Sequence, residues 1–301
     1  MKLGNGPRIQ DWRSCAFGFQ LPALANKAVP RPARGSIAQC NGIKPGMTRT
    51  NTVWDDGTLA VVLSRFAPHE RHAPHTDRYS RLTLTLRGGF EEEVRSRRVV
   101  VEPGEVLFKS HRVVHENRFG PSGAALASLV FKADVQRDSG LVLGWTVHRE
   151  AKTSTLVFDA LEAAFAGHSH AVRTAASDAL AVQTEPPPRV AAPAWLQQLH
   201  EEFRSATLAE IDVAARAEAA GAHPAHASRL FRRCFGSSIT QHALEQGVRR
   251  ATALLARPDL RLADVAQQAG FYDQSHMNRV FRRVTRRTPG HYRAVLSQAA
   301  G

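Results

Sequence analysis

Amide, hydroxyl and guanidinium side chains gather between Arg261 and Tyr292, in a stretch whose apolar residues recur at helical spacing. Amides and arginines have the donor geometry that matches base edges and phosphates in the major groove of DNA. The face that this spacing leaves exposed carries Gln274, Ser275, His276, Asn278, Arg279, Arg282 and Arg283. This set of side chains indicates a surface that reads double-stranded DNA.

Two short helices joined by a turn are needed to present that face. Gly270 ends the first helix as a residue that tolerates positive φ, and Asp273 caps the second helix. The predicted buried positions are Leu262, Val265, Ala266 and Ala269 in the first helix and Met277, Val280, Phe281 and Val284 in the second. The stretch is therefore predicted to form a helix-turn-helix unit.

An internal repeat shows that this unit occurs twice. The hexapeptide SRLFRR at 228–233 recurs as NRVFRR at 278–283, and AEAAG at 217–221 recurs as AQQAG at 266–270. We therefore predict a first unit at 211–235 and a second unit at 261–292, joined by a long helix from about Thr240 to Ala256.

The middle of the chain has a different pattern. From Asn51 onward, β-rich runs such as LAVVLSRF, SRLTLTLRG and AALASLVF are separated by turn residues, which predicts a small antiparallel sandwich or barrel. In one of these runs, Leu82, Leu84 and Leu86 alternate with polar residues, as expected for a strand with one buried face. A helix is expected at 155–166, packed either on the barrel or on a second copy of the chain, followed by a polar segment and a stiff Pro-rich spacer at 185–188.

The expected organisation has four parts and belongs to the α+β class. Residues 1–50 form an irregular arm, 51–150 a sensor domain, 151–192 a helix and Pro-rich linker, and 193–301 a helical DNA-binding domain. The net charge of +13 comes mostly from arginine and favours a polyanionic partner. The three cysteines have no framework spacing, and no apolar run approaches the ~20 residues of a membrane span, so we expect a cytoplasmic protein that binds no membrane.

The C-terminal hundred residues resemble the AraC/XylS family of bacterial transcription regulators. The resemblance is carried by ADVAQQAGFYDQSHMNRVFRR at 263–283 and TPGHYR at 288–293. It implies two recognition helices in successive major grooves, with base-facing residues Ala225, Ser228 and Arg229 in the first unit and Gln274, Ser275, Asn278 and Arg279 in the second. His226 and His276 lie beside them and could contact phosphate, and we interpret Arg232, Arg233, Arg282 and Arg283 as charges that position the DNA backbone or are structural. Arg286 stands where the family usually has a glycine that ends the recognition helix.

Two segments of the β-rich part, 72–92 and 102–121, resemble the half-motifs of a cupin barrel, a sensor domain that many members of that family carry. The resemblance makes His72, His75 and His115 candidate ligands for a divalent metal such as zinc, iron or nickel. Arg78 or Tyr79 stands near the place of the usual acidic ligand. The same histidines could instead line a pocket for an organic effector, or be structural or exposed.

These features predict a ligand-responsive, sequence-specific transcription regulator that is not an enzyme. Promoter DNA and a small-molecule effector are the expected partners, with RNA polymerase and a second copy of the chain as further ones, and family membership favours activation over repression. The alternatives are a metal-dependent cupin dioxygenase or isomerase with a basic helical appendage, and a non-specific architectural DNA-binding protein. The repeat argues against the enzyme, because catalysis has no use for two recognition helices.

Overall fold

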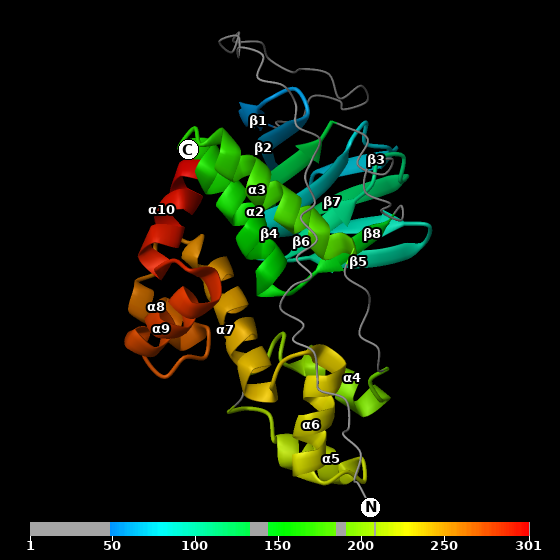
Figure 1. Ribbon diagram of the computed structural model, residues 1–301, viewed down its shortest axis with the longest axis vertical. Helices are drawn as coiled ribbons and strands as arrows, with labels where there is room; N and C mark the ends of the chain where they lie inside the picture. The colour runs from blue at the N-terminus through cyan, green and yellow to red at the C-terminus, as the bar shows by residue number, and fades with distance from the viewer. Residues whose placement is uncertain (1–48, 133–143, 185–190, 208, 301) are drawn as a thin grey trace, which may run out of the picture. The chain divides into compact units, whose positions relative to one another are not determined.

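Eight strands form one antiparallel sheet in the N-terminal part of the computed structural model (Figure 1). The structure describes residues 49–132, 144–184, 191–207 and 209–300, all within the compact unit Cys40–Gly301. The strands pair in the order β1-β2-β7-β4-β6-β8, with β3 added to β7 and β5 added to β4. Their bounds are β1 Arg49–Asp55, β2 Leu59–Phe66, β3 Arg71–His75, β4 Ser80–Val94, β5 Arg97–Val101, β6 Val106–Lys109, β7 His115–Phe131 and β8 Trp145–His148.

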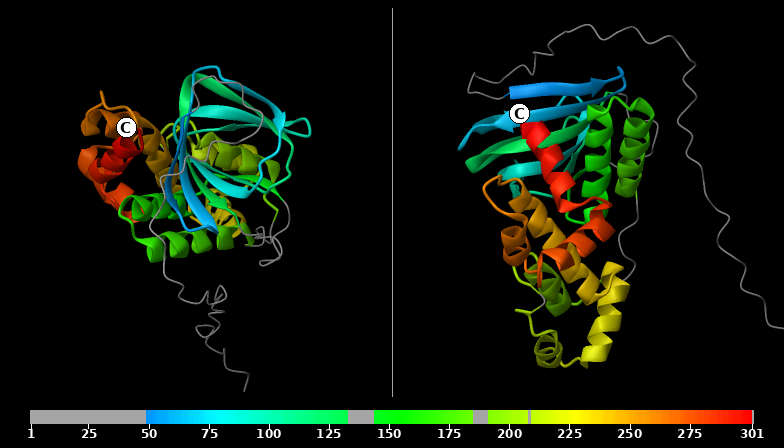
Figure 2. Two further views of the ribbon diagram at one scale, coloured as in Figure 1. Left: turned by 90° about the horizontal axis from the view of Figure 1, so that it is seen from above. Right: turned by 90° about the vertical axis from the view of Figure 1, so that its left-hand side faces the viewer.

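The two longest strands, β4 and β7, bend the sheet into a curved, barrel-like form (Figure 2). One end of β7 pairs with β3 and the other with β2, while β4 pairs with β6 and then with β5. The register between β4 and β7 shifts around Gly88, where a Cβ atom would lie 1.9 Å from the carbonyl oxygen of Gly123. Both glycines have positive φ, so the bend needs residues without side chains. Strand β3 continues past the end of β2 along β7, so the end of β3 lies beside the start of β7.

Both faces of the central strand β4 are buried, which corrects the expectation of one buried face. Leu82, Leu84 and Leu86 pack with the helices, as predicted. Thr83 and Thr85 on the opposite face are also buried, at 5% and 0% exposure, because the curved sheet covers them. Thr83 satisfies its hydroxyl with Ser128 on the neighbouring strand, at 3.0 Å.

Two helices, α2 (Ala151–Phe165) and α3 (Ser169–Ala181), lie side by side next to the sheet (Figure 2). The first is the predicted helix, and it packs on the strands and also on the C-terminal helices. The second corrects the expectation of a polar segment beyond His168. Its small apolar residues Val172, Ala175, Ala176 and Ala179 are all buried, which explains why a sequence with many polar residues forms a packed helix. It ends in a short 3₁₀ turn at Val182–Thr184.

Seven helices follow in the described part of the C-terminal region (Figure 1). They are α4 Ala194–Glu202, α5 Val213–Ala219, α6 Pro224–Phe235, α7 Ile239–Leu255, α8 Leu262–Gln268, α9 Gln274–Thr285 and α10 Pro289–Ala300. The pairs α5–α6 and α8–α9 lie where the repeat places its two units, and α7 is the predicted long helix between them. The N-terminal arm, apart from its last two residues, and the Pro-rich spacer at 185–188 lie outside the described residues.

The buried side chains of the described residues form three clusters. The largest joins the helix-covered face of the sheet to α2, α3, the C-terminal half of α7 and the helices α8–α10. A second cluster belongs to α4, α6 and the start of α7, with Phe203 and Phe231 fully buried in it. The third fills the curved sheet around Phe90 and Phe119. The second unit therefore shares a core with the sheet, whereas the first unit has a core of its own.

Candidate functional site

Helix α9 forms where the sequence places it because both of its ends are capped. The side chain of Asp273 accepts a hydrogen bond from the backbone N–H of His276 at 2.6 Å, as a helix N-cap does. Met277, Val280 and Phe281 are buried along one side. Phe281 is fully buried and meets the Tyr292 ring edge-on, with ring centroids 5.5 Å apart. This packing fixes which side of α9 faces solvent.

The predicted base-reading residues of α9 lie on that solvent side. Gln274, Ser275, Arg279 and Arg282 are exposed, and His276 and Asn278 are half-buried at its margin. The ring of His276 packs edge-on against Phe271, at 5.5 Å between centroids.

Helix α6 presents a similar exposed side, with fewer side chains that can make bidentate hydrogen bonds to bases. Its predicted contact residues Ala225, His226, Ser228, Arg229 and Arg232 are all exposed. The opposite side buries Ala227, Phe231 and Cys234. Ala225 offers a methyl group and Ser228 one hydroxyl, so Arg229 is the only predicted base-facing residue of this helix capable of bidentate hydrogen bonding to a base.

The turn after α9 keeps its geometry although an arginine replaces the usual glycine. Arg286 has φ 61° and its backbone N–H bonds to the carbonyl oxygen of Arg282, so it ends the helix in the left-handed conformation. Gly236 takes the same role after α6, with φ 77°. A side chain in this conformation costs roughly 1–2 kcal/mol relative to glycine.

The arginines on these two faces are available to a ligand. Within the described part of the chain, Arg229, Arg232, Arg279 and Arg282 form no ion pair, and their side chains make no hydrogen bond. Arg283 differs, because it donates to the side chain of Gln241 on α7 at 3.3 Å. Exposed cations without acidic partners favour contact with phosphate.

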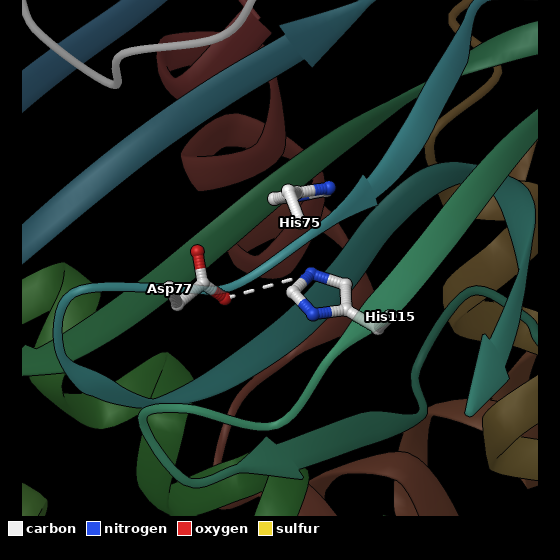
Figure 3. Close-up of side chains that lie close together, drawn as sticks. All are labelled: His75, Asp77 and His115. Carbon is white, nitrogen blue, oxygen red and sulfur yellow. Dashed lines mark ion pairs between the residues drawn. The ribbon is translucent and has the colours of Figure 1, made fainter. Parts of the chain in front are cut away.

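A second candidate site is a cluster of titratable side chains where β3 ends and β7 begins. His75, Asp77 and His115 each offer a ligand atom, and these atoms lie within 4.8 Å of one another (Figure 3). His75 pairs directly with His115 across β3 and β7, with ring centroids 4.2 Å apart. Asp77 follows β3, and its Oδ2 atom lies 3.8 Å from Nε2 of His115.

Backbone contacts set the tautomer of both histidines. Nδ1 of His75 donates to the carbonyl oxygen of Ala73 at 2.8 Å, and Nδ1 of His115 donates to that of Val113 at 2.9 Å. In the neutral ring, each Nε2 then carries a lone pair that points away from the backbone partner. This is the arrangement found in histidines that bind metals.

Burial and neighbouring charges lower the pKa values of two residues of the cluster, His115 and Asp77. Burial, followed by the charge of Lys109, lowers the pKa of His115 to about 4. Burial alone would raise the pKa of Asp77, but Arg81 and Lys109 outweigh it and lower that pKa to about 2. Near neutral pH the site therefore combines a carboxylate with a neutral, buried His115.

Lys109 connects this cluster to a fully buried carboxylate. Its Nζ atom lies 3.3 Å from Oδ2 of Asp77 and donates to Glu92 at 2.9 Å. Glu92 also accepts hydrogen bonds from Asn117 and from the indole N–H of Trp145, both at 2.7 Å. Such a network is rigid and polar, so it suits recognition of a polar ligand or an ion.

The structure brings His75 and His115 into one set of ligand atoms, while the third predicted ligand, His72, lies beside that set with its ring centroid 5.8 Å from that of His75. Nε2 of His72 lies 2.9 Å from Oε1 of Glu70, and its ring packs edge-on against Phe66 and Phe119. Asp77 is the acidic residue of this cluster, next to Arg78 and Tyr79, where the resemblance to cupins places the usual acidic ligand. Two imidazoles and one carboxylate are a donor set that fits a divalent transition metal. To bind one, Asp77 would exchange its contact with Lys109 for the metal.

Sequence reasoning missed Asp77, Lys109 and Glu92. Asp77 had a signal, since it stands two residues after His75, the spacing that puts side chains on one face of an extended chain. The other two lie in ordinary strands: Lys109 pairs with Arg81, far along β4 from Glu92, so the curvature of the sheet makes them neighbours.

A family model described as a helix-turn-helix domain matches residues 216–294. The HTH-type transcriptional regulator GlxA of Rhizobium meliloti (strain 1021) is 34% identical over 101 residues, which cover 34% of this chain and 31% of the relative. The arabinose operon regulatory protein of Escherichia coli (strain K12) is 32% identical over 83 residues, covering 28% of each chain. The chain carries an AraC-type helix-turn-helix domain.

This AraC-type domain confirms the resemblance to the AraC/XylS family seen in the sequence. The matched residues span about a third of the length of the curated relatives. Those relatives are named as regulators, so the enzyme alternative is not favoured. Among solved structures, ToxT from Vibrio cholerae O395 is 9% identical, covers 80% of this chain and 99% of its own, and has a TM-score of 0.34.

No helix in the described part of the chain combines the length and apolar character needed to cross a lipid bilayer.

Proposed function

We propose that this protein is a sequence-specific DNA-binding transcription regulator whose activity responds to an effector. The observation that carries the proposal is the construction of α6 and α9. Each helix buries one side in a core and leaves arginine and polar side chains exposed on the other. The two helices would enter successive major grooves about one helical turn (~34 Å) apart. The proposed division is a sensor domain at 51–150 and a DNA-binding domain at 193–301.

The second unit should carry most of the sequence discrimination. Its exposed face combines the amide of Gln274 with the guanidinium of Arg279, both suited to bidentate contacts with base edges. In the first unit, Arg229 would supply the base contact and the neighbouring residues would hold the DNA backbone.

The test is selection of binding sites from random duplex DNA, followed by affinity measurements at fixed salt. Binding to the selected site should exceed binding to bulk DNA by 10³ or more, and a ratio under about tenfold would identify an architectural binder instead. Arg279→Ala should cost about 1–3 kcal/mol and relax the preference at one base position. Arg282→Ala should weaken binding to all sequences alike. Arg98→Ala is the matched control, because Arg98 is an exposed arginine of the sheet that pairs with Glu93.

The sheet is the proposed sensor, and its polar cluster is the proposed effector site. The donor set of His75, Asp77 and His115 fits a divalent metal. Titration of the purified protein with Zn²⁺ or Ni²⁺ in a calorimeter tests this. Saturable binding lost in Asp77→Asn and retained in His72→Ala would support the site, whereas equal binding by all three proteins would remove the metal from the proposal.

A short strand offers a route from this cluster to the DNA-binding helices. Strand β6 ends at Lys109 beside Asp77, and the turn before it holds Glu105, which lies 3.2 Å from Arg204 and 3.7 Å from Arg249 on α7. An effector that moves Lys109 would change these contacts. It can shift the equilibrium between arrangements with and without them only by the difference between its binding free energies for the two.

Activation of transcription by contact with RNA polymerase, and a homodimer as the active form, complete the proposal. Transcription from a template carrying the selected site distinguishes activation from repression.

A further inference from the structure

A cavity of about 240 Å³ lies between the sheet and the helices α7 and α10. The sheet contributes Leu86, Arg87 and Ala125, and the helical side contributes Leu255, Ala256, Pro258, Arg293, Leu296, Ser297 and Ala299. Its walls are therefore mostly apolar. A second cavity, near Tyr292, has about 20 Å³ and holds no more than a single water molecule.

Arg293 is the unusual residue of this cavity. Its Nε and Nη2 atoms are buried and have no hydrogen-bond partner among the described residues. Arg293 as a whole is half-buried, and other half-buried arginines of the same region are satisfied: Arg250 donates to three backbone carbonyl groups, and Arg287 binds Glu162. A buried cationic donor without an acceptor is costly, so the position indicates a missing anionic partner.

The two unpartnered atoms define the shape of that partner. Nε and Nη2 form one edge of the guanidinium group, and their N–H bonds run parallel, which matches the two oxygens of a carboxylate. The surroundings are positive as well, because Arg87 is the other charged lining residue and the lining contains no acid. Asp259, whose pKa is lowered mainly by Arg257 and least by Arg293, is paired with Arg257 at 2.7 Å and so is not the partner of Arg293.

We propose that this cavity binds a small organic carboxylate, with the carboxylate on Arg293 and the hydrocarbon body against Leu86, Leu255 and Leu296. The site is separate from the histidine cluster of the sheet. Because the ligand would touch the sheet and two helices of the DNA-binding part, it would bias their arrangement; that consequence rests on the proposed function, whereas the binding itself does not.

The test compares octanoate with 1-octanol, two probes that share a hydrocarbon chain and differ in the charged group. The full-length protein, without DNA, is titrated in a calorimeter and in a thermal denaturation series. We expect saturable octanoate binding at least tenfold tighter than that of 1-octanol. Equal binding of both probes, or no binding of octanoate, would overturn the proposal without touching the proposed DNA binding.

Two variants assign the site. Arg293→Met should weaken octanoate binding about 10- to 100-fold and raise the melting temperature of the ligand-free protein, because it removes an unsatisfied buried charge. A purely structural arginine would lower that temperature instead. Ala125→Phe fills the cavity and should abolish binding with Arg293 intact, which keeps the site testable if Arg293→Met fails to fold. Arg98→Met is the charge-matched control and should bind octanoate like the wild type. Wild-type affinity in both site variants would refute the assignment.

Discussion

The buried carboxylate of Glu105 allows a sharp test of how the sheet is joined to the helices. This residue precedes β6 and is fully buried. Its Oε1 atom lies 3.2 Å from both Arg149 and Arg204 and 3.7 Å from Arg249, and its Oε2 atom accepts a backbone hydrogen bond from Glu102 at 2.9 Å. One buried carboxylate therefore contacts three guanidinium groups from different segments.

Glu105→Gln keeps the shape and removes the charge. Loss of one partner from a buried ion pair typically costs 3–5 kcal/mol. The arginine side chains are 10–30% exposed, so water would recover part of that loss, and we expect about 3 kcal/mol. Glu102→Gln is the matched control, because Glu102 contacts Arg204 and Arg249 but its side chain is 45% exposed. It should cost less than about 1 kcal/mol.

The assay is urea denaturation followed by circular dichroism, with the free energy of unfolding of both variants compared with the wild type. Equal losses in the two variants would refute the reasoning, because burial would then not determine the strength of these contacts. A double-mutant cycle with Arg249→Met should return a coupling energy larger for Glu105 than for Glu102.

Two further predictions concern the helical part. Arg286→Gly should stabilise the protein by about 1 kcal/mol in the same denaturation assay, since φ at this position is 61°, and Gly236→Ala should have the opposite effect; a destabilised Arg286→Gly variant would contradict this account. Burial, and then the charge of His200, lowers the pKa of His242 to about 4, so between pH 6.5 and 4 the unfolded chain takes up a proton that the folded chain does not. His242 should therefore contribute a loss of about 3 kcal/mol as the pH drops through that window, beside a similar contribution from His115, and His242→Gln should remove only its own share. An unchanged pH profile in that variant would assign the effect to other groups.

The helical part was predictable from sequence because its signals are local. Apolar spacing, the cap at Asp273 and the repeat of LFRR-like segments each lie within one or two turns of helix, and the structure has the corresponding helices. Even Arg286 fits, because a turn held by a neighbouring hydrogen bond tolerates a side chain at moderate cost.

The sheet and its site were harder because their signals are distant in sequence. Strand β3 is short and contains Pro74, and its pairing with β7 across forty residues defines it. The link between Lys109 and Glu92 depends on the curvature of the sheet, because Lys109 pairs with Arg81 at the other end of β4. Helix α3 was missed because its buried stripe consists of Val172 and three alanines, whose apolar signal is weak among polar neighbours.

The division of the core gives the two helix-turn-helix units different cooperativity. Phe281 belongs to the cluster that runs through the sheet, whereas Phe231 lies in a separate cluster with α4. Backbone amides of α6 should therefore exchange with solvent through a local opening that leaves the sheet intact, while those of α9 should exchange only when the larger unit opens. A substitution in the sheet would then change protection in α9 and leave α6 unaffected, so the unit that we propose to make most of the base contacts is also the one whose stability follows the proposed sensor.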